Sequence, residues 1–314
     1  MVRILVNDGI HPDGKKMMQE AGFEVVDQKI PQDQLTERLN EFDAICVRSA
    51  TKVRKELIDA SPNLKVIARG GVGLDNIDVD YAKSKGIKVI NTPAASSRSV
   101  AELVFGHMLN CARSLHDSNR KMPQQGSTEF GSLKKSYSKG AELYGKNLGV
   151  IGMGRIGQEA IKIGIGFGMN ILAHDPYINE IEVEYGSSQF AGKAAIKSVS
   201  KEQLLTNSDF ITLHVPFNGS PVLSHDEFKL MKPNVVLVNA ARGGVVDEEA
   251  LLKALNNGQI ASVGTDVFEN EPTPKDELLA HDKVSLSPHI GASTLEAQRN
   301  VGTELAKQII EVLG

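Results

Sequence analysis

Apolar and polar residues alternate regularly over the first hundred positions. Short apolar runs with the period of a strand are separated by segments in which apolar residues recur every three or four positions, the period of a helix. The expected strands are 2–6, 24–27, 44–47, 64–68 and 88–91, and the expected helices are 11–21, 32–42, 55–60 and 79–85. Strands that alternate with helices are typical of a parallel sheet with right-handed crossovers. This part of the chain is therefore expected to form a small α/β domain.

A second region with the same alternation begins near residue 146. Before it, 99–115 has the pattern of a long apolar helix, and 116–146 are polar and rich in lysine and turn residues, which favours a loop between domains or at an oligomer surface. Strand and helix patterns then alternate to about residue 285, and 294–313 predicts one long terminal helix. At 314 residues the chain suits two domains of about 100–200 residues each. We expect two α/β domains, each with a doubly wound parallel sheet.

Composition and charge narrow the classes of protein. Hydrophobic residues make up 41% and charged residues 24%, which is typical of a globular protein, and no apolar run approaches the roughly 20 residues of a membrane span. The N-terminus lacks the features of a signal peptide, and Cys46 and Cys111 lie in apolar contexts without a CxxC pair. We therefore expect buried free thiols, a cytoplasmic location and no metal site. The net charge of −4 argues against a nucleic-acid partner. An anionic ligand would therefore have to be bound by a few well-placed cationic side chains, because the overall charge of the protein does not attract it.

A glycine motif, GMGRIG at 152–157, follows an apolar strand pattern and begins a helix pattern. In a dinucleotide-binding turn the first glycine allows the tight turn, the second lets the backbone approach a pyrophosphate, and the third lets helix and strand pack closely. Gly152, Gly154 and Gly157 hold these three positions. The N-terminus of the following helix offers unpaired N–H groups to phosphate. The succession of strand, motif and helix predicts a dinucleotide site, whereas the glycines alone would indicate only a turn.

Asp175 bears on the choice of dinucleotide. It follows the next strand pattern, 170–173, roughly 20 residues after the first glycine, close to the spacing at which an acidic residue binds the adenosine ribose. A carboxylate there accepts hydrogen bonds from the ribose hydroxyls but repels a 2′-phosphate. His174 and Pro176 flank it, so no arginine is adjacent to bind such a phosphate. NAD is therefore expected in preference to NADP.

Three successive strand patterns end in polar residues of the kinds that catalysis uses. Arg242 follows strand 235–239, Glu269 and Glu271 follow strand 261–266, and His289 follows strand 284–286. Ligands of open α/β sheets bind beyond the carboxyl ends of the strands, so these side chains are expected at one edge of the sheet. Each of them alone would be an ordinary surface charge or turn residue.

These residue types suit the oxidation of a hydroxyl group next to a carboxylate. A guanidinium binds a carboxylate in a fork and polarises the oxygen on C2, and an imidazole accepts the hydroxyl proton as hydride leaves. A carboxylate beside the imidazole holds its orientation and favours its protonated form. We therefore assign Arg242 to the substrate and His289 to proton transfer. The residue types leave Glu269 and Glu271 as alternatives for the partner of the imidazole.

Motifs along nearly the whole chain resemble those of one family. They are VRSAT at 47–51, RGGVGLDN at 69–76, NTP at 91–93, RSVAEL at 98–103, GMGRIG, LHVPFN, NAARGGVVDE, GTDVFENEP and SPHIGAST. Together they resemble the D-isomer-specific 2-hydroxyacid dehydrogenase family, and most closely its phosphoglycerate dehydrogenases. The resemblance implies a Rossmann nucleotide-binding domain, 98–285, inserted into a flavodoxin-like substrate domain, 1–97 completed by 286–314, with a cleft between them.

The resemblance also implies roles for individual residues. Glu271, rather than Glu269, would be the partner of His289, and Arg242 would bind the substrate. The implied cofactor contacts lie in the glycine motif and at the ends of later strands: Gly152, Gly154, Arg155, Ile156, Gly157, Asp175, Val215, Pro216, Ala240 and Asp266. The implied reaction is NAD-dependent oxidation of D-3-phosphoglycerate at C2, a step of serine biosynthesis, in a homodimer.

A phosphorylated substrate needs further cations. Arg48 and Arg69 follow strand ends of the first domain and are expected to bind substrate, and Lys134 or Lys135 could reach in from a partner subunit. One alternative is a dehydrogenase for an unphosphorylated acid such as glycerate, hydroxypyruvate or glyoxylate. Another, from a different class, is an NAD-sensing binding protein or corepressor.

Two features depart from the family pattern. Many relatives carry Asn where this chain has Ser96, which weakens one expected substrate contact. Many phosphoglycerate dehydrogenases also continue into regulatory domains beyond the point that corresponds to Gly314, so feedback inhibition by serine is not expected here.

Overall fold

The computed structural model describes all 314 residues, which divide into two compact units. Unit 1 comprises Met1–Ser97 and Ala292–Gly314, and unit 2 comprises Arg98–Gly291. The expected bounds put 286–291 in the first domain, whereas the structure has them in unit 2, because β13 (Val284–Leu286) is the edge strand of that unit's sheet. None of the helices combines the length and the apolar character that crossing a membrane requires.

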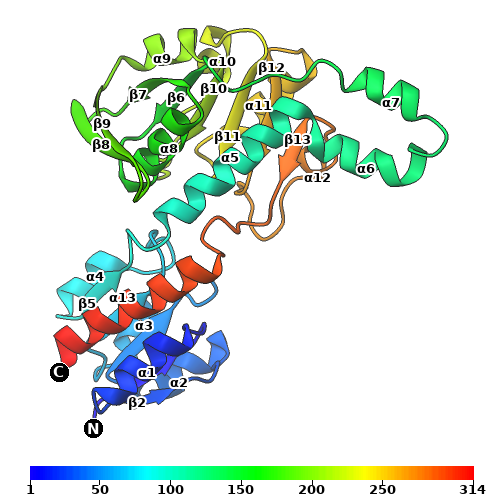
Figure 1. The fold of residues 1–314 in the computed structure, drawn as a ribbon. Helices are drawn as coiled ribbons and strands as arrows, with labels where there is room; N and C mark the ends of the chain where they lie inside the picture. Colours follow the sequence, from blue (N-terminus) through cyan, green and yellow to red (C-terminus); the bar gives the residue numbers. More distant parts are fainter. The chain divides into compact units, whose positions relative to one another are not determined.

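Unit 1 is built on a five-stranded parallel sheet in the order β2-β1-β3-β4-β5 (Figure 1). The strands are β1 (Arg3–Val6), β2 (Glu24–Val26), β3 (Ala44–Val47), β4 (Val66–Arg69) and β5 (Lys88–Asn91). The helices are α1 (Pro12–Glu20), α2 (Leu35–Arg38), α3 (Lys55–Asp59), α4 (Val79–Ser84) and α13 (Leu295–Leu313). The segment 32–42, expected to be helical, forms a short α2 flanked by 3₁₀ helices at Gln32–Gln34 and Leu39–Glu41, so only its centre is α-helical.

Helices cover both faces of this sheet. Successive residues of a strand point to opposite faces, so Leu5 packs in the core formed with α2, α3 and α4, whereas Ile4 and Val6 pack in the core formed with α1 and α13. The helices α1 and α13 approach closely at two glycines, since a Cβ added to Gly14 would overlap the carbonyl oxygen of Gly302. The two ends of the chain therefore share one core.

Unit 2 is built on a six-stranded parallel sheet in the order β13-β12-β11-β10-β6-β7. The strands, besides β13, are β6 (Asn147–Ile151), β7 (Asn170–His174), β10 (Phe210–Leu213), β11 (Val235–Asn239) and β12 (Ile260–Thr265). The helices are α5 (Ser97–Arg113), α6 (Leu115–Gln125), α7 (Phe130–Ser136), α8 (Arg155–Gly166), α9 (Lys201–Asn207), α10 (His225–Leu230), α11 (Glu248–Asn256) and α12 (Asp276–Leu279).

The loop expected over 116–146 is wrong, because α6 and α7 form there and extend from the rest of unit 2 as a two-helix arm (Figure 1). Ser114, in the left-handed region at a φ of 51°, separates α5 from α6. Asp117 accepts a hydrogen bond from Lys121 of the same helix at 2.9 Å and one from the hydroxyl of Tyr137, directly after α7, at 2.7 Å; the second bond ties the two helices together. No residue of α6 is buried, so the apolar period that would predict a helix is missing.

A two-stranded antiparallel hairpin, β8 (Glu180–Gly186) with β9 (Ala191–Lys197), follows β7 where the continued α/β pattern would have a helix. Glutamates alternate with Ile181, Val183 and Tyr185 along β8, which is the period of a strand with one buried face. Val183 is buried in the core that contains residues of α8. The alternation along β8 is therefore a sequence signal that could have predicted this hairpin.

Both cysteines are free and buried, as expected. Burial raises the thiol pKa of Cys46 to about 12 and that of Cys111 to about 11. Neither thiol is therefore ionised near neutral pH, and both act as small apolar core residues.

Candidate active site

The glycine motif lies at the switch point of the six-stranded sheet, where β6 pairs with β7 on one side and with β10 on the other. Gly152 has a φ of 99°, and its N–H donates to the carbonyl of His174 at 2.8 Å. A Cβ added to Gly152 would lie 2.6 Å from the carbonyl oxygen of His214. The turn itself therefore requires the first glycine of the motif.

The other two glycines of the motif differ in how closely other atoms pack against them. A Cβ at Gly157 would overlap the carbonyl oxygen of Gly152, because α8 packs directly on the turn there. A Cβ at Gly154 would meet nothing within 4 Å. Gly154 is the N-cap of α8, which begins with Arg155 and Ile156. Because glycine has no side chain, none of the first N–H groups of the helix is capped by this residue. The Gly154 side of the turn therefore has both the space and the backbone N–H groups that an anion needs.

Asp175 lies beside the same turn. It follows β7, and its carboxylate accepts the backbone N–H of Met153, inside the glycine motif, at 2.9 Å. The carboxylate also accepts the N–H groups of Tyr177 at 2.9 Å and Ile178 at 3.2 Å. The structure thus brings the predicted acidic residue next to the glycine motif.

The remaining predicted cofactor residues follow the next three strands. Val215 and Pro216 come after β10, Ala240 comes directly after β11, and Asp266 comes directly after β12. Val215 lies against the turn, since its Cγ1 would be 2.9 Å from a Cβ at Gly152. Because these strands are parallel, all of these residues leave the sheet at the same edge as the glycine motif.

His214, the residue before Val215, is a half-buried histidine near the turn whose position the sequence did not predict. Its Nε2 lies 3.2 Å from the hydroxyl of Thr212, and its Nδ1 has no hydrogen-bond partner. Burial lowers the pKa of His214 to about 3. The imidazole is therefore neutral and adds no positive charge beside the glycine motif.

Glu271 and His289 form a direct pair. The Nδ1 of His289 lies 2.8 Å from Oε2 of Glu271, and Oε1 of Glu271 accepts the backbone N–H of Phe268 at 3.0 Å. About half of the His289 side chain is exposed. An ionised Glu271 accepts the Nδ1–H, which leaves the lone pair of a neutral imidazole on Nε2. The pair can therefore offer one oriented proton acceptor to a ligand.

His289 has an unusual backbone. Its φ of 54° is in the left-handed region, which few residues other than glycine adopt. Such a conformation costs of order 1–3 kcal/mol and persists only where the surroundings hold it. The two following N–H groups, of Ile290 and Gly291, both donate to Asp266 at 2.8 Å, and the Gly291 carbonyl accepts the hydroxyl of Ser99 at 2.7 Å.

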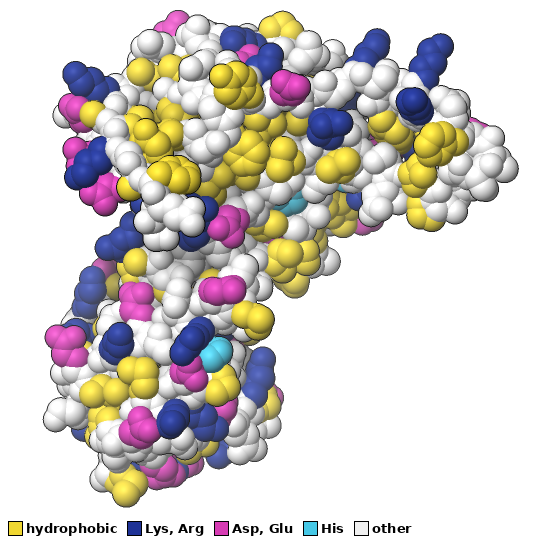
Figure 2. All heavy atoms as spheres, viewed as in Figure 1, with side chains coloured by type: hydrophobic (Ala, Val, Ile, Leu, Met, Phe, Trp, Pro, Cys, Tyr) yellow, Lys and Arg dark blue, Asp and Glu magenta, His cyan; other side chains and the backbone are white.

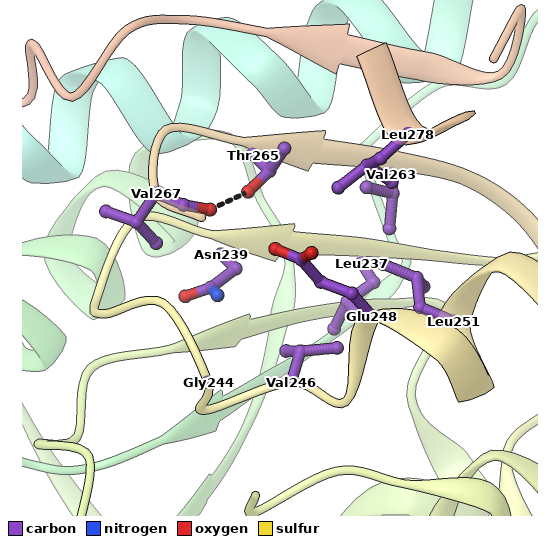
Figure 3. A pocket seen from close by; sticks show the side chains of 10 residues that line it. All are labelled: Leu237, Asn239, Gly244, Val246, Glu248, Leu251, Val263, Thr265, Val267 and Leu278. Carbon is purple, nitrogen blue, oxygen red and sulfur yellow. Dashed lines mark hydrogen bonds between the residues drawn. The ribbon is translucent and has the colours of Figure 1, made fainter. Parts of the chain in front are cut away.

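Glu269, the alternative partner, faces a different set of groups. Its Oε1 accepts the backbone N–H of Glu248 at 3.0 Å, Glu248 Oε1 accepts the N–H of Glu269 at 2.8 Å, and Lys275 donates to Glu269 at 2.7 Å. Glu248 is 4% exposed, and burial raises its pKa. Figure 3 shows its carboxylate extending from α11 toward Asn239 and Thr265. These reciprocal bonds fix the start of the loop that carries Glu271, a role for Glu248 that the sequence did not suggest.

Arg242 lies in the loop after β11, the neighbour of β12 in the sheet. Its guanidinium donates to the carbonyl of Ala241 at 2.7 Å, and its own carbonyl accepts the side-chain amide of Asn239 at 3.1 Å. The side chain is half-buried. The three residues predicted for catalysis thus follow three adjacent parallel strands.

In unit 1, Arg48 lines a cavity of about 260 Å³ at the carboxyl ends of β1, β3 and β4. The side chain of Arg48 is half-buried and makes no hydrogen bond or ion pair. Asp8 holds its loop, because the carboxylate accepts the backbone N–H of Arg48 at 2.7 Å and that of Thr51 at 3.0 Å. From the other side, the amide of Asn76 donates to the carbonyls of Arg48 and Thr51.

Two other residues of unit 1 were singled out in the sequence. Arg69 ends β4, and its guanidinium lies against the backbone of Gly71, where an added Cβ would overlap it. Ser96 is 1% exposed. Its hydroxyl is too enclosed to form part of an open surface.

Comparisons with known proteins agree with this geometry. Residues 105–291 match the family model described as "D-isomer specific 2-hydroxyacid dehydrogenase, NAD binding domain". The chain is 44% identical over 315 residues to the D-3-phosphoglycerate dehydrogenase of Methanocaldococcus jannaschii, a match that covers 100% of this chain and 58% of that protein. It is also 44% identical over 319 residues to the hydroxypyruvate reductase of Thermotoga maritima, with 99% of this chain and 98% of that protein covered.

A solved structure of a related reductase has a similar fold. The NADPH-dependent glyoxylate/hydroxypyruvate reductase from Sinorhizobium meliloti matches with a TM-score of 0.83 at 29% identity, over 98% of this chain and 94% of that one. The chain spans little more than half the length of the curated phosphoglycerate dehydrogenases it matches.

Replacing Gly154 by alanine should weaken dinucleotide binding and leave the fold intact, because the added methyl group fills only open space beside the start of α8. By calorimetric titration we expect the Kd for NADH to rise by about tenfold or more. The melting temperature should stay within about 2 °C of that of the wild type. Gly157→Ala is the contrasting variant and should lower the melting temperature by several degrees, because its methyl group overlaps the turn. Equal losses of stability in the two variants would contradict this division of roles.

Proposed function

Since the chain belongs to the D-isomer-specific 2-hydroxyacid dehydrogenase family and carries its NAD-binding domain, we propose that it oxidises D-3-phosphoglycerate at C2 to 3-phosphohydroxypyruvate. The observation that carries the dehydrogenase part is the 2.8 Å pair of His289 and Glu271, which lie in the loops after β13 and β12, with Arg242 in the loop after the neighbouring strand β11. The product is a precursor of serine, so the reaction would serve serine biosynthesis.

In the proposed reaction Arg242 binds the substrate carboxylate and polarises the oxygen on C2. His289 accepts the proton of the C2 hydroxyl at Nε2 while the C2 hydrogen leaves as hydride and the carbonyl forms. Glu271 stays ionised, keeps the imidazole in one orientation through Nδ1, and stabilises the imidazolium that results. In the reverse direction His289 returns the proton.

The bound NAD supplies the hydride acceptor. Gly152, Gly154 and Gly157, together with the start of α8 at Arg155 and Ile156, would hold its pyrophosphate. The carboxylate of Asp175 would bind the adenosine ribose and disfavour a 2′-phosphate. Residues at the ends of the next three strands would make further contacts with the cofactor: Val215, Pro216, Ala240 and Asp266.

Arg48 is the basis for proposing a phosphorylated substrate. Its half-buried guanidinium has no partner in the protein, and a phosphate brought out of water needs cationic donors because burial of an unpaired charge is costly. We assign the phosphate to Arg48 and Arg69, with Lys134 or Lys135 of a partner subunit as a further donor. The second candidate is reduction of hydroxypyruvate, because a relative of equal identity carries that name.

We also propose that the chain acts as a homodimer through the arm formed by α6 and α7. Leu115, Met122 and Phe130 of the arm are 48%, 42% and 60% exposed. Figure 2 shows hydrophobic and basic side chains together on the surface of this arm. Large exposed apolar side chains on a projecting element are typical of a surface that a partner covers.

Sedimentation equilibrium tests the assembly. We expect the mass of two chains for the wild type and a shift toward the mass of one chain for a Met122→Asp, Phe130→Asp variant, because buried charges would oppose association. Leu230→Asp, at a similarly exposed apolar residue of α10, is the matched control and should leave the mass unchanged. A wild type that sediments as a single chain would contradict the proposal.

His289→Ala should lose most of its turnover, because a positioned acid or base contributes roughly 10²–10⁴-fold to such reactions. The measurement is the change in NADH absorbance with 3-phosphohydroxypyruvate, and the Kd for NADH should change little. His225→Ala, at an exposed histidine of α10, is the control and should keep full activity. Wild-type turnover in His289→Ala would refute the mechanism. Tight NADH binding without turnover in the wild type would favour the binding-protein alternative.

The substrate is tested by comparing kcat/KM for 3-phosphohydroxypyruvate and for hydroxypyruvate. We expect the wild type to prefer the phosphorylated acid by about 100-fold, as two charge-assisted hydrogen bonds would give. Arg48→Ala, alone and with Arg69→Ala, should remove most of that preference and leave kcat/KM for hydroxypyruvate within a few-fold. Arg54→Ala, which removes an arginine paired with Asp78 in the same unit, should preserve the preference. A wild type that prefers hydroxypyruvate would refute the phosphoglycerate assignment and leave the family assignment intact.

A further inference from the structure

A buried histidine, His107 of α5, packs against β12 and contacts two serines in and directly after the neighbouring strand β13. It is 3% exposed. Gly264 of β12 makes room for it, since a Cβ at that position would lie 2.5 Å from the Cβ of His107. Nδ1 of His107 lies 2.9 Å from the hydroxyl of Ser285, and Nε2 lies 2.8 Å from the hydroxyl of Ser287. The proposed mechanism gives no role to any of these groups.

The register of the sheet explains how one imidazole reaches both hydroxyls. β12 and β13 pair in parallel with Gly264 opposite Ser285, which brings Asp266 level with Ser287. Ser285 and Ser287 are two positions apart, so they point to the same face of the sheet. The imidazole lies on that face because glycine opposite Ser285 leaves the space.

The direction of each hydrogen bond follows from the carboxylate at one end. An ionised Asp266 only accepts, so the hydroxyl of Ser287 donates to it, at 2.6 Å. The oxygen of Ser287 therefore accepts the Nε2–H of His107. Burial lowers the pKa of His107, which favours the neutral ring, so its Nδ1 accepts the hydroxyl of Ser285. One tautomer of His107, with the proton on Nε2, satisfies the whole chain of hydrogen bonds.

Asp266 connects this chain of hydrogen bonds to the loop that carries His289. Besides the hydroxyl of Ser287, its carboxylate accepts the N–H groups of Ile290 and Gly291, both at 2.8 Å. These are the two residues after His289, whose left-handed φ of 54° must be held by its surroundings. The orientation of Asp266 therefore fixes the backbone that aims His289.

We propose that His107 and Ser287 are positioning residues that hold Asp266, and through it the left-handed backbone of His289, in the geometry that proton transfer needs. The inference rests on the proposed role of His289. It is independent of the identity of the substrate, because no residue of this chain of hydrogen bonds is assigned to substrate recognition.

Two serine-to-alanine variants, one within β13 and one directly after it, separate positioning from simple stability. Ser287→Ala removes the donor to Asp266 and the acceptor of His107, whereas Ser285→Ala removes a hydroxyl that touches His107 alone. We expect Ser287→Ala to lower kcat by about tenfold, since small misplacements of a reacting group are costly, and to change the pH profile of kcat. Ser285→Ala should stay within about twofold of the wild type in kcat. Ser287→Thr, which keeps the hydroxyl, should restore turnover.

Amide hydrogen exchange gives a readout that does not require activity. The amides of Ile290 and Gly291 should exchange about tenfold faster in Ser287→Ala than in the wild type or in Ser285→Ala. Nitrogen-15 spectra of the imidazoles should show His107 as the neutral Nε2–H tautomer in the wild type. Equal effects of the two alanine variants on kcat and on these amides would overturn the inference, as would unchanged turnover in a Ser287→Ala variant with faster exchange. Absence of turnover in the wild type would instead refute the proposed function.

Discussion

In the six-stranded sheet, Asn239 of β11 pairs with Thr265 of β12, and Thr265 pairs with Leu286 of β13. Three parallel strands therefore end at the same level, and the loops that follow them emerge side by side. This register is the constraint on which the candidate site depends, since Arg242, Glu271 and His289 lie far apart along the chain and each follows one of these strands. A shift of one residue in any pairing would turn alternate side chains to the other face and separate the loops.

Buried or half-buried carboxylates then fix the loops that the sheet brings together. Asp266 binds the backbone after His289, Glu248 binds the backbone at Glu269, and Asp8 binds the backbone of the Arg48 loop in unit 1. Each carboxylate accepts N–H groups that would otherwise lack partners, and hydrogen bonds to a charged acceptor are worth about 1.5–3 kcal/mol each. These hydrogen bonds hold the irregular segments beyond the strands in place, which a site built on loops requires.

The sequence predicted most of the strands, because buried parallel strands are short apolar runs bounded by turn residues. It predicted the approach of His289 and Glu271 only through resemblance, since spacing could not distinguish Glu271 from Glu269. The structure separates them, because Glu269 is bound to Glu248 and Lys275. The arm of α6 and α7 was missed because α6 buries no residue, so its helix has no apolar period. His107 was missed because its partners are serines 178 and 180 residues away, one in β13 and one directly after it.

The close contact of Gly14 with Gly302 has a consequence for synthesis on the ribosome. The apolar face of unit 1 that Ile4 and Val6 share with Leu305 and Ile309 stays uncovered until α13 has left the exit tunnel. Unit 2 is a continuous segment, so all of its strands are available before that moment. The order of emergence therefore favours folding of unit 2 first, and until then the apolar face of the N-terminal strands is exposed to aggregation. Closure of unit 1 by α13 would then follow the folding of unit 2.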